Sequence, residues 1–465
     1  MELIGMLKDF KHQVREFNRF KDQEYGALFW DMGLGKTRVA IELSEHWYTT
    51  YTVNAVVVIT MKSLIGNWVN VELPIHAALP YNTFSWGKDK TVPKSQKLLY
   101  FVINIDGLLS NAFKDTFKEF MRVYPNFGLI IDESTVVKSG KAKRTRMAIK
   151  ISERAKRRFI MTGTPITNSP MDLYSQCMIL KPGLLGYDSL IAFRNRYAIT
   201  KVMKFGMRSF EQIVGYKNLG ELTQTVQKFA AIMKIEEGID IPPKRYRVIN
   251  VELTVEQKKA YEELKSKAVA WIQEHEITTA NAVSLINRLM QICSGQLKVS
   301  DNQYISIANN RLDVLSDLID ECDGKTIIWC SFVNSALDIM KTLGNHAIHL
   351  PSGLKLDEQQ IIVNEFKTGK VKAMVANPAS QGHGHTWIES SNVIYFSNSY
   401  NWGLRTQSEG RTYRAGQAKS VLYTDLIAKG TIEDRVLTVL KKKEEMADEV
   451  ITSKTLLEML KNESA

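Results

Sequence analysis

The chain has 465 residues, of which 44% are hydrophobic and 24% are charged, and its formal net charge is +11. This length exceeds that of one ordinary domain, and no apolar run approaches the ~20 residues of a membrane span. The composition therefore predicts a multidomain globular protein without a membrane segment. Acidic residues within the short apolar N-terminus argue against a signal peptide.

Four cysteines, Cys177, Cys293, Cys322 and Cys330, are spread along the chain, and none forms a Cys-x-x-Cys pair. Such spacing does not favour a disulfide framework or a cysteine zinc site. We expect reduced thiols in a cytosol-like compartment.

Part of the positive charge is concentrated in one stretch. The segment from Lys138 to Arg158 contains ten Lys or Arg residues and one acid, Glu153. Basic surfaces attract polyanions, because each cation placed on a phosphate releases a condensed counterion. A nucleic-acid contact and an ordinary solvated helix face both fit this pattern.

Short apolar runs alternate with amphipathic stretches in the first part of the chain. Buried strands that alternate with helices imply a parallel sheet covered on both faces. The predicted strands are Gly26–Trp30, Ala55–Thr60, Leu98–Ile103, Leu129–Asp132 and Phe159–Gly163.

The pattern changes from Pro170 to about Asn310, which is predicted to be mostly helical. Within it, Lys201–Tyr216 could form a β-hairpin that turns near Gly206. Gln257–Gln273 contains good helix formers and few breakers, so we expect a helix there.

Alternation resumes after Asn310 and predicts a second α/β lobe. The expected strands are Thr326–Ser331, Ala347–Leu350, Ala373–Asn377, Val393–Phe396 and Val421–Ile427, and the expected helices are Ser335–Leu343, Asp357–Phe366 and Ile432–Lys443. The predicted fold class is thus α/β, with two parallel-sheet lobes and a mainly helical insertion. Lobe 1 is assigned to residues 1–235, with the insertion from about 170, and lobe 2 to residues 236–465, with a helical start to about 310.

A glycine-rich loop follows the first strand and opens a helix that runs to about Trp47. Its sequence is Asp31-Met32-Gly33-Leu34-Gly35-Lys36-Thr37. Glycines let backbone N–H groups curl around phosphates, and a helix N-terminus favours an anion. Lys36 can reach the phosphates and the Thr37 hydroxyl can ligate Mg²⁺. Trp30 occupies the first glycine position of the strict phosphate-loop pattern, so a chance glycine-rich turn is the alternative.

The apolar strand that ends in Asp132-Glu133 places two carboxylates together. In an open α/β sheet, side chains at the carboxyl ends of strands face the ligand crevice. Asp132 can hold Mg²⁺ through water while Glu133 deprotonates the attacking water. Alone, such an ending is usually a solvated strand end, but about a hundred residues after a phosphate loop it favours nucleotide hydrolysis.

The order of further motifs resembles the Swi/Snf-type ATPases of helicase superfamily two. The segments that carry the resemblance are Lys8–Gln13, Ile59–Trp68, Met161–Ile166, Ile239–Lys244, Leu253–Gln257, Gly430–Asp434, and Gln407 with Arg411, Arg414, Gly416 and Gln417. The resemblance spans about residues 8 to 440 and implies two RecA-like lobes that bind ATP and Mg²⁺.

The resemblance also implies roles for single residues. Gln13 reads adenine; Gly33, Gly35, Lys36 and Thr37 hold phosphates and Mg²⁺; Asp132 holds Mg²⁺; Glu133 is the base; and Arg411 and Arg414, from the second lobe, are arginine fingers. The residues expected to contact DNA phosphates are Lys62, Ser63, Ser331, Gly382 and Gly384, and those expected to couple the two sites are Thr135, Thr162, Thr164 and Gln407. Binding of this kind is largely independent of base sequence and sensitive to salt.

Several positions depart from the family pattern. Thr135 stands where the family has the histidine that couples the two sites, and Met233-Lys234 replaces an Arg-Arg pair. The segment Ser380–Thr386 also differs from the usual motif V. These variants resemble compact prokaryotic and phage members, which implies the cytoplasm of a prokaryote or of a phage-infected host.

Three other features have ordinary explanations. His383 and His385 form a His-x-His without further metal ligands nearby, so we do not expect a metal there. Trp68 and Trp402 could stack on bases, but we expect them to be packed in the interior.

The predicted function is an ATP-dependent translocase on duplex or branched DNA, acting as a monomer. No chromatin-reading segment is visible, which disfavours nucleosome remodelling. A strand-separating helicase, an ATP-gated DNA-binding switch, and a motor subunit of a nuclease or modification complex stay open as alternatives.

Overall fold

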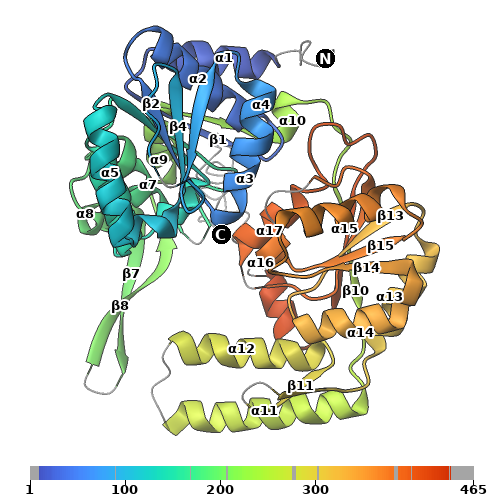
Figure 1. The fold of residues 1–465 in the computed structure, drawn as a ribbon. Coiled ribbons are helices and arrows are strands. Elements are labelled where there is room, and N and C mark those ends of the chain that lie inside the picture. Colours follow the sequence, from blue (N-terminus) through green and yellow to red (C-terminus); the bar gives the residue numbers. More distant parts are fainter. Residues whose placement is uncertain are drawn as a thin grey trace. The chain divides into compact units, whose positions relative to one another are not determined.

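The computed structural model describes residues 10–89, 91–167, 169–205, 208–274, 279–300, 303–381, 386–399, 401–438 and 440. The described residues divide into two compact units, one up to Asp240 and the other from Ile241 to residue 440. Each unit has its own parallel sheet with helices packed on it (Figure 1). This arrangement confirms the predicted α/β class with two parallel-sheet lobes. Among the described helices, none is long and apolar enough to cross a membrane.

The sheet of unit 1 has seven strands in the order β3-β4-β2-β5-β6-β1-β9, and all neighbours are parallel. The strands are β1 (Tyr25–Trp30), β2 (Ala55–Thr60), β3 (Tyr81–Ser85), β4 (Leu98–Asn104), β5 (Phe127–Asp132), β6 (Arg157–Met161) and β9 (Ala230–Met233). The carboxyl ends of these strands therefore meet at one edge of the sheet.

Helices of unit 1 lie on both faces of this sheet (Figure 1). They are α1 (Lys11–Phe20), α2 (Lys36–Thr49), α3 (Ile65–Asn67), α4 (Leu73–His76), α5 (Asn111–Val123), α6 (Lys143–Ser152), α7 (Asp172–Leu180), α8 (Leu190–Tyr197), α9 (Leu219–Gln227) and α10 (Ile235–Gly238), with short turns η1 (Lys62–Leu64), η2 (Trp68–Glu72), η3 (Ile105–Leu109) and η4 (Ser134–Val137). A separate antiparallel hairpin, β7 (Ala198–Phe205) with β8 (Arg208–Tyr216), extends from this unit.

The sheet of unit 2 has six parallel strands in the order β10-β17-β16-β13-β15-β14. They are β10 (Arg245–Asn250), β13 (Lys325–Trp329), β14 (Ala347–Leu350), β15 (Ala373–Ala376), β16 (Ser390–Tyr395) and β17 (Leu422–Ile427). The other elements of unit 2 are α11 (Val255–Glu274), α12 (Thr279–Cys293), β11 (Gln296–Ser300), β12 (Gln303–Ser306), α13 (Asn310–Glu321), α14 (Val333–Leu343), η5 (Gly344–His346), α15 (Leu356–Thr368), α16 (Pro378–Gln381), α17 (Trp402–Glu409) and helical residues 432–438.

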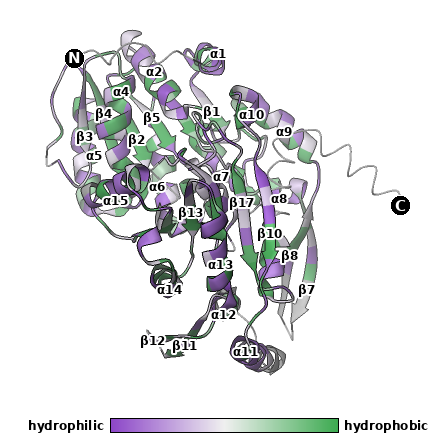
Figure 2. Cartoon of the chain, turned by 90° about the vertical axis from the view of Figure 1, so that its right-hand side faces the viewer, coloured by the Kyte–Doolittle hydropathy of each residue, from purple (hydrophilic) through white to green (hydrophobic). Residues whose placement is uncertain are grey.

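Strands β2 and β5 are mostly hydrophobic, whereas the helices are mixed (Figure 2). Every residue of β2 and of β5 is buried, as expected for strands covered by helices on both faces. A cluster of aromatic side chains from α5 packs on this sheet, with Phe113, Phe117 and Phe120 lying against Phe101 of β4.

Each predicted strand is present, and so is the predicted hairpin at Lys201–Tyr216, although Gly206 lies outside the described residues. Three sheet strands were not predicted, namely β3, β9 and β10. The last two lie within the stretch expected to be mostly helical, which also contains the small hairpin of β11 and β12. All three unpredicted strands are at sheet edges.

Candidate functional site

The segment from Asp31 to Gly35 joins the carboxyl end of β1 to the first turn of α2. Gly33 and Gly35 have φ angles of 88° and 79°, in the left-handed region that favours glycine. A β-carbon on Gly35 would also collide with the side-chain amide of Gln13. The two glycines thus let the backbone curl at the N-terminus of α2, where N–H groups and the helix dipole favour an anion.

Lys36 begins α2, and its ammonium folds back over the loop. Its Nζ donates to the carbonyl oxygens of Trp30 at 2.9 Å and Asp31 at 3.1 Å. The carboxylate of Asp31 accepts from the backbone N–H of Ile235 at 3.0 Å, which ties the loop to the end of β9. Lys36 is therefore held beside the loop, and Thr37 follows it in the first turn of the same helix.

The predicted adenine reader, Gln13, lies against this loop from α1. Its Nε2 donates to the carbonyl oxygen of Leu34 at 3.1 Å, and its Oε1 accepts from the N–H of Phe10 at 3.3 Å. His12 also bonds to the Leu34 carbonyl at 3.0 Å. Gln13 is 3% exposed. In this conformation α1 supports the phosphate loop, and adenine recognition by Gln13 stays a prediction.

Asp132 ends β5 at the same edge of the sheet. Its Oδ2 accepts from the indole N–H of Trp68 at 2.8 Å and from the hydroxyl of Thr60 at 3.2 Å. Burial, and next the charge of Glu133, raise the pKa of Asp132 to about 6, while Trp68 and Lys36 act in the opposite direction. Asp132 is thus a buried carboxylate whose hydrogen bonds come from neutral donors.

Glu133 follows in a left-handed backbone conformation, with φ of 53°. Strain of this kind in a non-glycine residue is typical of functional positions. Its Oε2 accepts from the hydroxyl of Thr162 at 2.9 Å, and the Thr162 hydroxyl accepts from the N–H of Thr164 at 3.2 Å. Of the predicted coupling residues, Thr162 is therefore linked directly to the predicted base, and Thr164 is linked to it through the Thr162 hydroxyl.

A second link between these segments was missed by the sequence analysis. The hydroxyl of Ser134 donates to Oε1 of Gln176 at 2.6 Å, and Nε2 of Gln176 donates to the carbonyl of Pro165 at 2.7 Å. Gln176 is completely buried in α7, and no sequence motif marks it. Within the part of the chain that the structure describes, the hydroxyl of Thr135 forms no hydrogen bond.

The donor set at this edge fits a magnesium ion. Mg²⁺ prefers carboxylate and hydroxyl oxygens, which Asp132 and Thr37 supply. Burial raises the pKa of Asp132, and the charge of Lys36 offsets only part of that effect. A divalent cation would offset more of it and would neutralise charge on the phosphates.

The predicted DNA contacts of unit 1 are at the surface. Lys62 and Ser63 form the exposed turn η1, immediately after β2. In α6, the side chains of Lys143, Arg146 and Lys150 are exposed at spacings of three and four residues, so they share one face of the helix. The basic stretch seen in the sequence thus includes a solvated stripe.

In unit 2, the predicted phosphate contact Ser331 follows β13. Its N–H donates to Oγ of Ser397 at 2.8 Å, and its hydroxyl donates to the carbonyl of Ser397 at 3.2 Å. It lines a cavity of about 260 Å³ together with Asn377 and Asn398. The other predicted contacts, Gly382 and Gly384, lie outside the described residues, as do His383 and His385.

The predicted arginine fingers follow the end of α17, which carries Gln407. Arg411 and Gln407 are each 7% exposed, and Arg414 donates to the hydroxyl of Thr386 at 2.7 Å. Gln417, from the same motif, has a structural position. Its Nε2 donates to the carbonyl oxygens of Ile388, Ser390 and Thr412 at 3.0 to 3.1 Å, which closes the turn after α17.

Two family models match the chain. The SNF2-related domain covers residues 12–298, and the helicase conserved C-terminal domain covers residues 310–416. The chain belongs to the SNF2-related family. It is a helicase-like ATP hydrolase.

Relatives of this SNF2 chain include an uncharacterized ATP-dependent helicase of Mycoplasma genitalium, which is 28% identical over 98% of this chain and 43% of its own length. A putative protein p41 of Acyrthosiphon pisum secondary endosymbiont phage 1 is 23% identical over 92% of this chain and 94% of its own length. The DNA annealing helicase and endonuclease ZRANB3 of Bos taurus is 24% identical over 91% of this chain and 38% of its own length. The chain thus spans less than half of the Mycoplasma and Bos taurus proteins.

Among solved structures, the Sulfolobus solfataricus SWI2/SNF2 ATPase core in complex with dsDNA is similar to this chain. It is 23% identical, with a TM-score of 0.42, over 96% of this chain and 93% of that chain.

Unit 2 of this SNF2 chain also contains buried ion pairs that the sequence analysis did not identify. Arg405 donates to Asp425 at 2.5 and 3.1 Å and to Glu409 at 2.7 Å. Arg311 forms a two-point pair with Glu433 at 2.6 and 3.2 Å. Glu433 lies in the segment Gly430–Asp434, which carries part of the family resemblance, and its pairing with Arg311 gives that segment a structural role.

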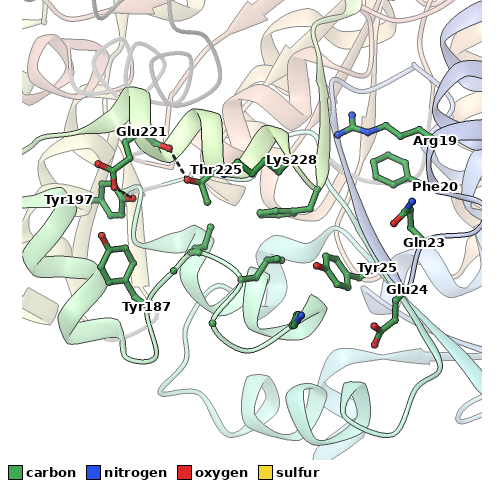
Figure 3. A pocket seen from close by; sticks show the side chains of 16 residues that line it. Arg19, Phe20, Gln23, Glu24, Tyr25, Tyr187, Tyr197, Glu221, Thr225 and Lys228 are labelled. Carbon is green, nitrogen blue, oxygen red and sulfur yellow. Dashed lines mark hydrogen bonds between the residues drawn. The ribbon is translucent and has the colours of Figure 1, made fainter.

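Unit 1 also contains a cavity of about 790 Å³ (Figure 3). Tyr25, the first residue of β1, and Phe229, just before β9, contribute to its lining, so it lies at the amino ends of these strands. The phosphate loop follows the carboxyl end of β1. None of the predicted site residues lines this cavity.

Proposed function

We propose that the chain is a DNA-stimulated ATP hydrolase that moves along duplex DNA without sustained strand separation. The observation that carries the proposal is the exposed basic stripe of Lys143, Arg146 and Lys150 on α6, the helix between the strand of the acidic pair and β6. ATP hydrolysis belongs to the family, whereas movement on duplex DNA is our inference.

In this proposal the phosphate loop binds MgATP. Gly33, Gly35 and Lys36 hold the phosphates, and Thr37 and Asp132 hold Mg²⁺, which neutralises phosphate charge when bound. The side-chain amide of Gln13 moves from Leu34 to the adenine edge. This exchange costs little, because one hydrogen bond replaces another.

Glu133 is proposed as the base that takes the proton of the attacking water. The hydroxyl of Thr162 fixes one carboxylate oxygen, Oε2, and so leaves Oε1 for the water. Holding the base in one orientation lowers the entropic cost of reaching the transition state. Arg411 and Arg414 are proposed to stabilise the charge of the transferring phosphoryl group, a role that rests on the motif they occupy.

The DNA track is proposed to include Lys62 and Ser63 in unit 1 and Ser331, Gly382 and Gly384 in unit 2. Hydroxyl groups, glycine N–H groups and cations contact phosphate oxygens without reading bases. Affinity should therefore depend on salt much more than on DNA sequence. Thr135 and Gln407 are proposed to couple this track to hydrolysis.

The test combines hydrolysis with movement. Phosphate release is measured with no DNA, single-stranded DNA and duplex DNA over a salt series, and movement is measured as displacement of the third strand of a triplex. We expect duplex DNA to stimulate hydrolysis and ATP to drive displacement, with Lys36→Ala as the inactive control. Absence of stimulation at every salt concentration would refute the proposal. Stimulation without displacement would identify an ATP-gated switch instead.

A strand-separating helicase is the second candidate, and the hairpin of β7 and β8 favours it. The hairpin pairs only with itself, and Ile199, Val202 and Val214 on it are 45%, 59% and 56% exposed. Apolar side chains of this kind can unstack base pairs. A gel assay on forked duplexes with a trap strand distinguishes this activity from translocation, because only a helicase releases single strands.

A motor module that acts with other domains or subunits is the third candidate. The chain spans only 43% of the Mycoplasma genitalium relative and 38% of the Bos taurus relative, so similar segments occur inside longer proteins. Light scattering of the purified chain, alone and on duplex DNA, tests the expected monomer. ATP-driven triplex displacement by the chain alone would argue against a requirement for a partner.

A further inference from the structure

One surface segment of unit 1 contacts the carboxylate of Asp132 at both of its ends. Thr60 is the last residue of β2, and Trp68 is the first residue of η2. Both donate to the same atom, Oδ2 of Asp132, at 3.2 Å and 2.8 Å. The exposed turn of Lys62 and Ser63 lies between them in the chain.

The two contacts are buried. Thr60, Trp68 and Asp132 are 0%, 1% and 8% exposed. A hydrogen bond to a carboxylate is strong in such surroundings, because water cannot replace the donor. The backbone from Trp68 to Glu72 is a π-helical turn, a local distortion that often occurs at functional sites. The indole is thus a rigid connection between a surface turn and a buried carboxylate.

The hydrogen bonds also distinguish the two carboxylate oxygens. Because both donors bind Oδ2, the other oxygen of Asp132, Oδ1, would be the one available to Mg²⁺ or its hydration water. Trp68 is the nearer donor and has one N–H in a fixed direction, whereas the Thr60 hydroxyl can rotate. Trp68 should therefore determine the carboxylate orientation more strongly than Thr60.

We propose that Trp68, assisted by Thr60, is a positioning residue that orients Asp132 for Mg²⁺ and transmits DNA contact at Lys62 and Ser63 to that carboxylate. The inference rests on the proposed function, in which Asp132 holds Mg²⁺ and this turn meets DNA. It gives the chain a route between the two sites that does not need the histidine replaced by Thr135. A movement of the surface turn would alter the orientation of Asp132 through the indole.

The test compares three variants of the full chain. Trp68→Phe removes the N–H donor and keeps an aromatic ring, and Thr60→Val removes the hydroxyl at nearly constant volume. Trp47→Phe is the matched control. Trp47 is also 1% exposed in unit 1, and its N–H donates at 3.1 Å to the backbone carbonyl of Lys21, away from Asp132. Circular dichroism melting shows whether Trp68→Phe and Trp47→Phe are folded to the same extent.

Four quantities are measured for each variant: the Mg²⁺ concentration for half-maximal hydrolysis without DNA, the KM for ATP at saturating Mg²⁺, the factor by which saturating duplex DNA raises kcat, and the Kd for duplex DNA. For Trp68→Phe we expect the required Mg²⁺ to rise by about 10-fold, as for a lost hydrogen bond to a charged group. The stimulation factor should fall by about threefold to 10-fold. The KM for ATP and the Kd for DNA should stay within about twofold, because neither contact is removed.

Thr60→Val should shift both affected quantities in the same direction by a smaller factor, and Trp47→Phe should shift neither. Wild-type Mg²⁺ dependence in Trp68→Phe would overturn the positioning role, and equal shifts in Trp68→Phe and Trp47→Phe would show a general packing effect instead. A weakened Kd for DNA with an unchanged stimulation factor would overturn the transmission. If the wild type shows no DNA stimulation, the proposed function fails, while the Mg²⁺ comparison without DNA still decides the positioning role.

Discussion

Buried carboxylates occur in both units, but their partners differ. In unit 1, Asp132 accepts hydrogen bonds from the indole of Trp68 and the hydroxyl of Thr60, which are neutral donors. In unit 2, Glu409 accepts from the guanidinium of Arg405 at 2.7 Å and from the ammonium of Lys244 at 3.3 Å. Both carboxylates are buried, so they differ in the charge of the groups that donate these hydrogen bonds.

The pKa values follow this difference. Burial, and next the charge of Glu133, raise the pKa of Asp132 to about 6, and its two neutral donors together with the charge of Lys36 offset only part of that effect. Burial would also raise the pKa of Glu409, yet Lys244 and Arg405 bring it below its ordinary value. The charge of a buried carboxylate with a cationic partner is already balanced within the fold, whereas a buried carboxylate with neutral donors can still bind a cation. The comparison therefore separates a site from a structural network within one chain.

The largest effect should come from Glu133→Gln. The amide keeps the shape of the side chain and cannot take a proton, so kcat should fall by about 10² to 10⁴-fold while ATP binding is retained. Steady-state phosphate release and binding of a fluorescent ATP analogue measure the two properties. Glu45→Gln is the control, because Glu45 is also buried in unit 1 and accepts from the N–H of Leu79 rather than from a site residue. Turnover that survives in Glu133→Gln would show that another group is the base.

The next largest effect should come from the buried ion pairs of Arg405 in unit 2. Arg405→Met leaves the buried carboxylates of Asp425 and Glu409 without the guanidinium that pairs with both, so the free energy of unfolding should fall by about 3 to 5 kcal/mol. Urea unfolding measures the loss. Arg194→Met breaks an exposed pair with Glu211 and should cost less than about 1 kcal/mol. Equal losses in the two variants would contradict the structural role of the Arg405 network.

Much of the fold could be predicted, because buried parallel strands are continuous apolar runs. The run Ala55–Thr60 coincides with β2, and every residue in it is buried. Strand β10 was missed because it is an edge strand whose first four residues are exposed, so its pattern is polar. Strand β9, Ala230–Met233, has only four residues and lay within a stretch of helix-like composition.

The candidate site could be predicted only where its residues are close in sequence. The phosphate loop up to Thr37 and the pair Asp132-Glu133 are local patterns with a chemical meaning. The bond from Trp68 to Asp132 depends on strand order, because β2 is the neighbour of β5 and Ile59 lies opposite Ile131. Nothing in the spacing of 64 residues between Trp68 and Asp132 indicates that contact. The prediction that Trp68 is buried is correct. Its hydrogen bond to Asp132 was not predicted.

The exposed charge on α6 should affect DNA binding and not stability, unlike the buried charges. Reversing Lys143, Arg146 and Lys150 on α6 to Glu should weaken duplex DNA binding by about 30- to 100-fold at low salt and should reduce the slope of log K against log salt. Fluorescence anisotropy over a salt series measures both quantities. Stability should change little, because the three side chains are exposed.

The control for this stripe is a similar one on another helix of unit 1, α5. Lys114, Lys118 and Arg122 on α5 are exposed at i, i+4 and i+8, so their reversal changes the net charge equally. DNA affinity should fall much less in that variant. Equal losses from α5 and α6 would mean that net charge, rather than a track on α6, governs binding.

The smallest expected effect is a pH dependence that distinguishes the two kinds of buried carboxylate. Because the pKa of Asp132 is raised in the folded chain, its protonated form is favoured there, and the charged form destabilises unit 1 above a pH of about 6. Asp132→Asn should therefore stabilise the metal-free protein by about 2 kcal/mol at pH 7. This gain should shrink as the pH falls through about 6 and disappear near the ordinary pKa of 3.8. Urea unfolding in the presence of a chelator measures the gain.

Two comparisons make this pH dependence decisive. Asp115→Asn changes a carboxylate that is 77% exposed, and its effect on stability should be small at every pH. Added Mg²⁺ and ATP should remove the advantage of Asp132→Asn, because the wild-type carboxylate then gains a cation that the amide binds poorly. A stabilisation by Asp132→Asn that is the same at pH 5 and pH 7 would show that burial of this charge does not cost stability. In that case the difference between the neutral donors around Asp132 and the cations around Glu409 would not mark a cation site.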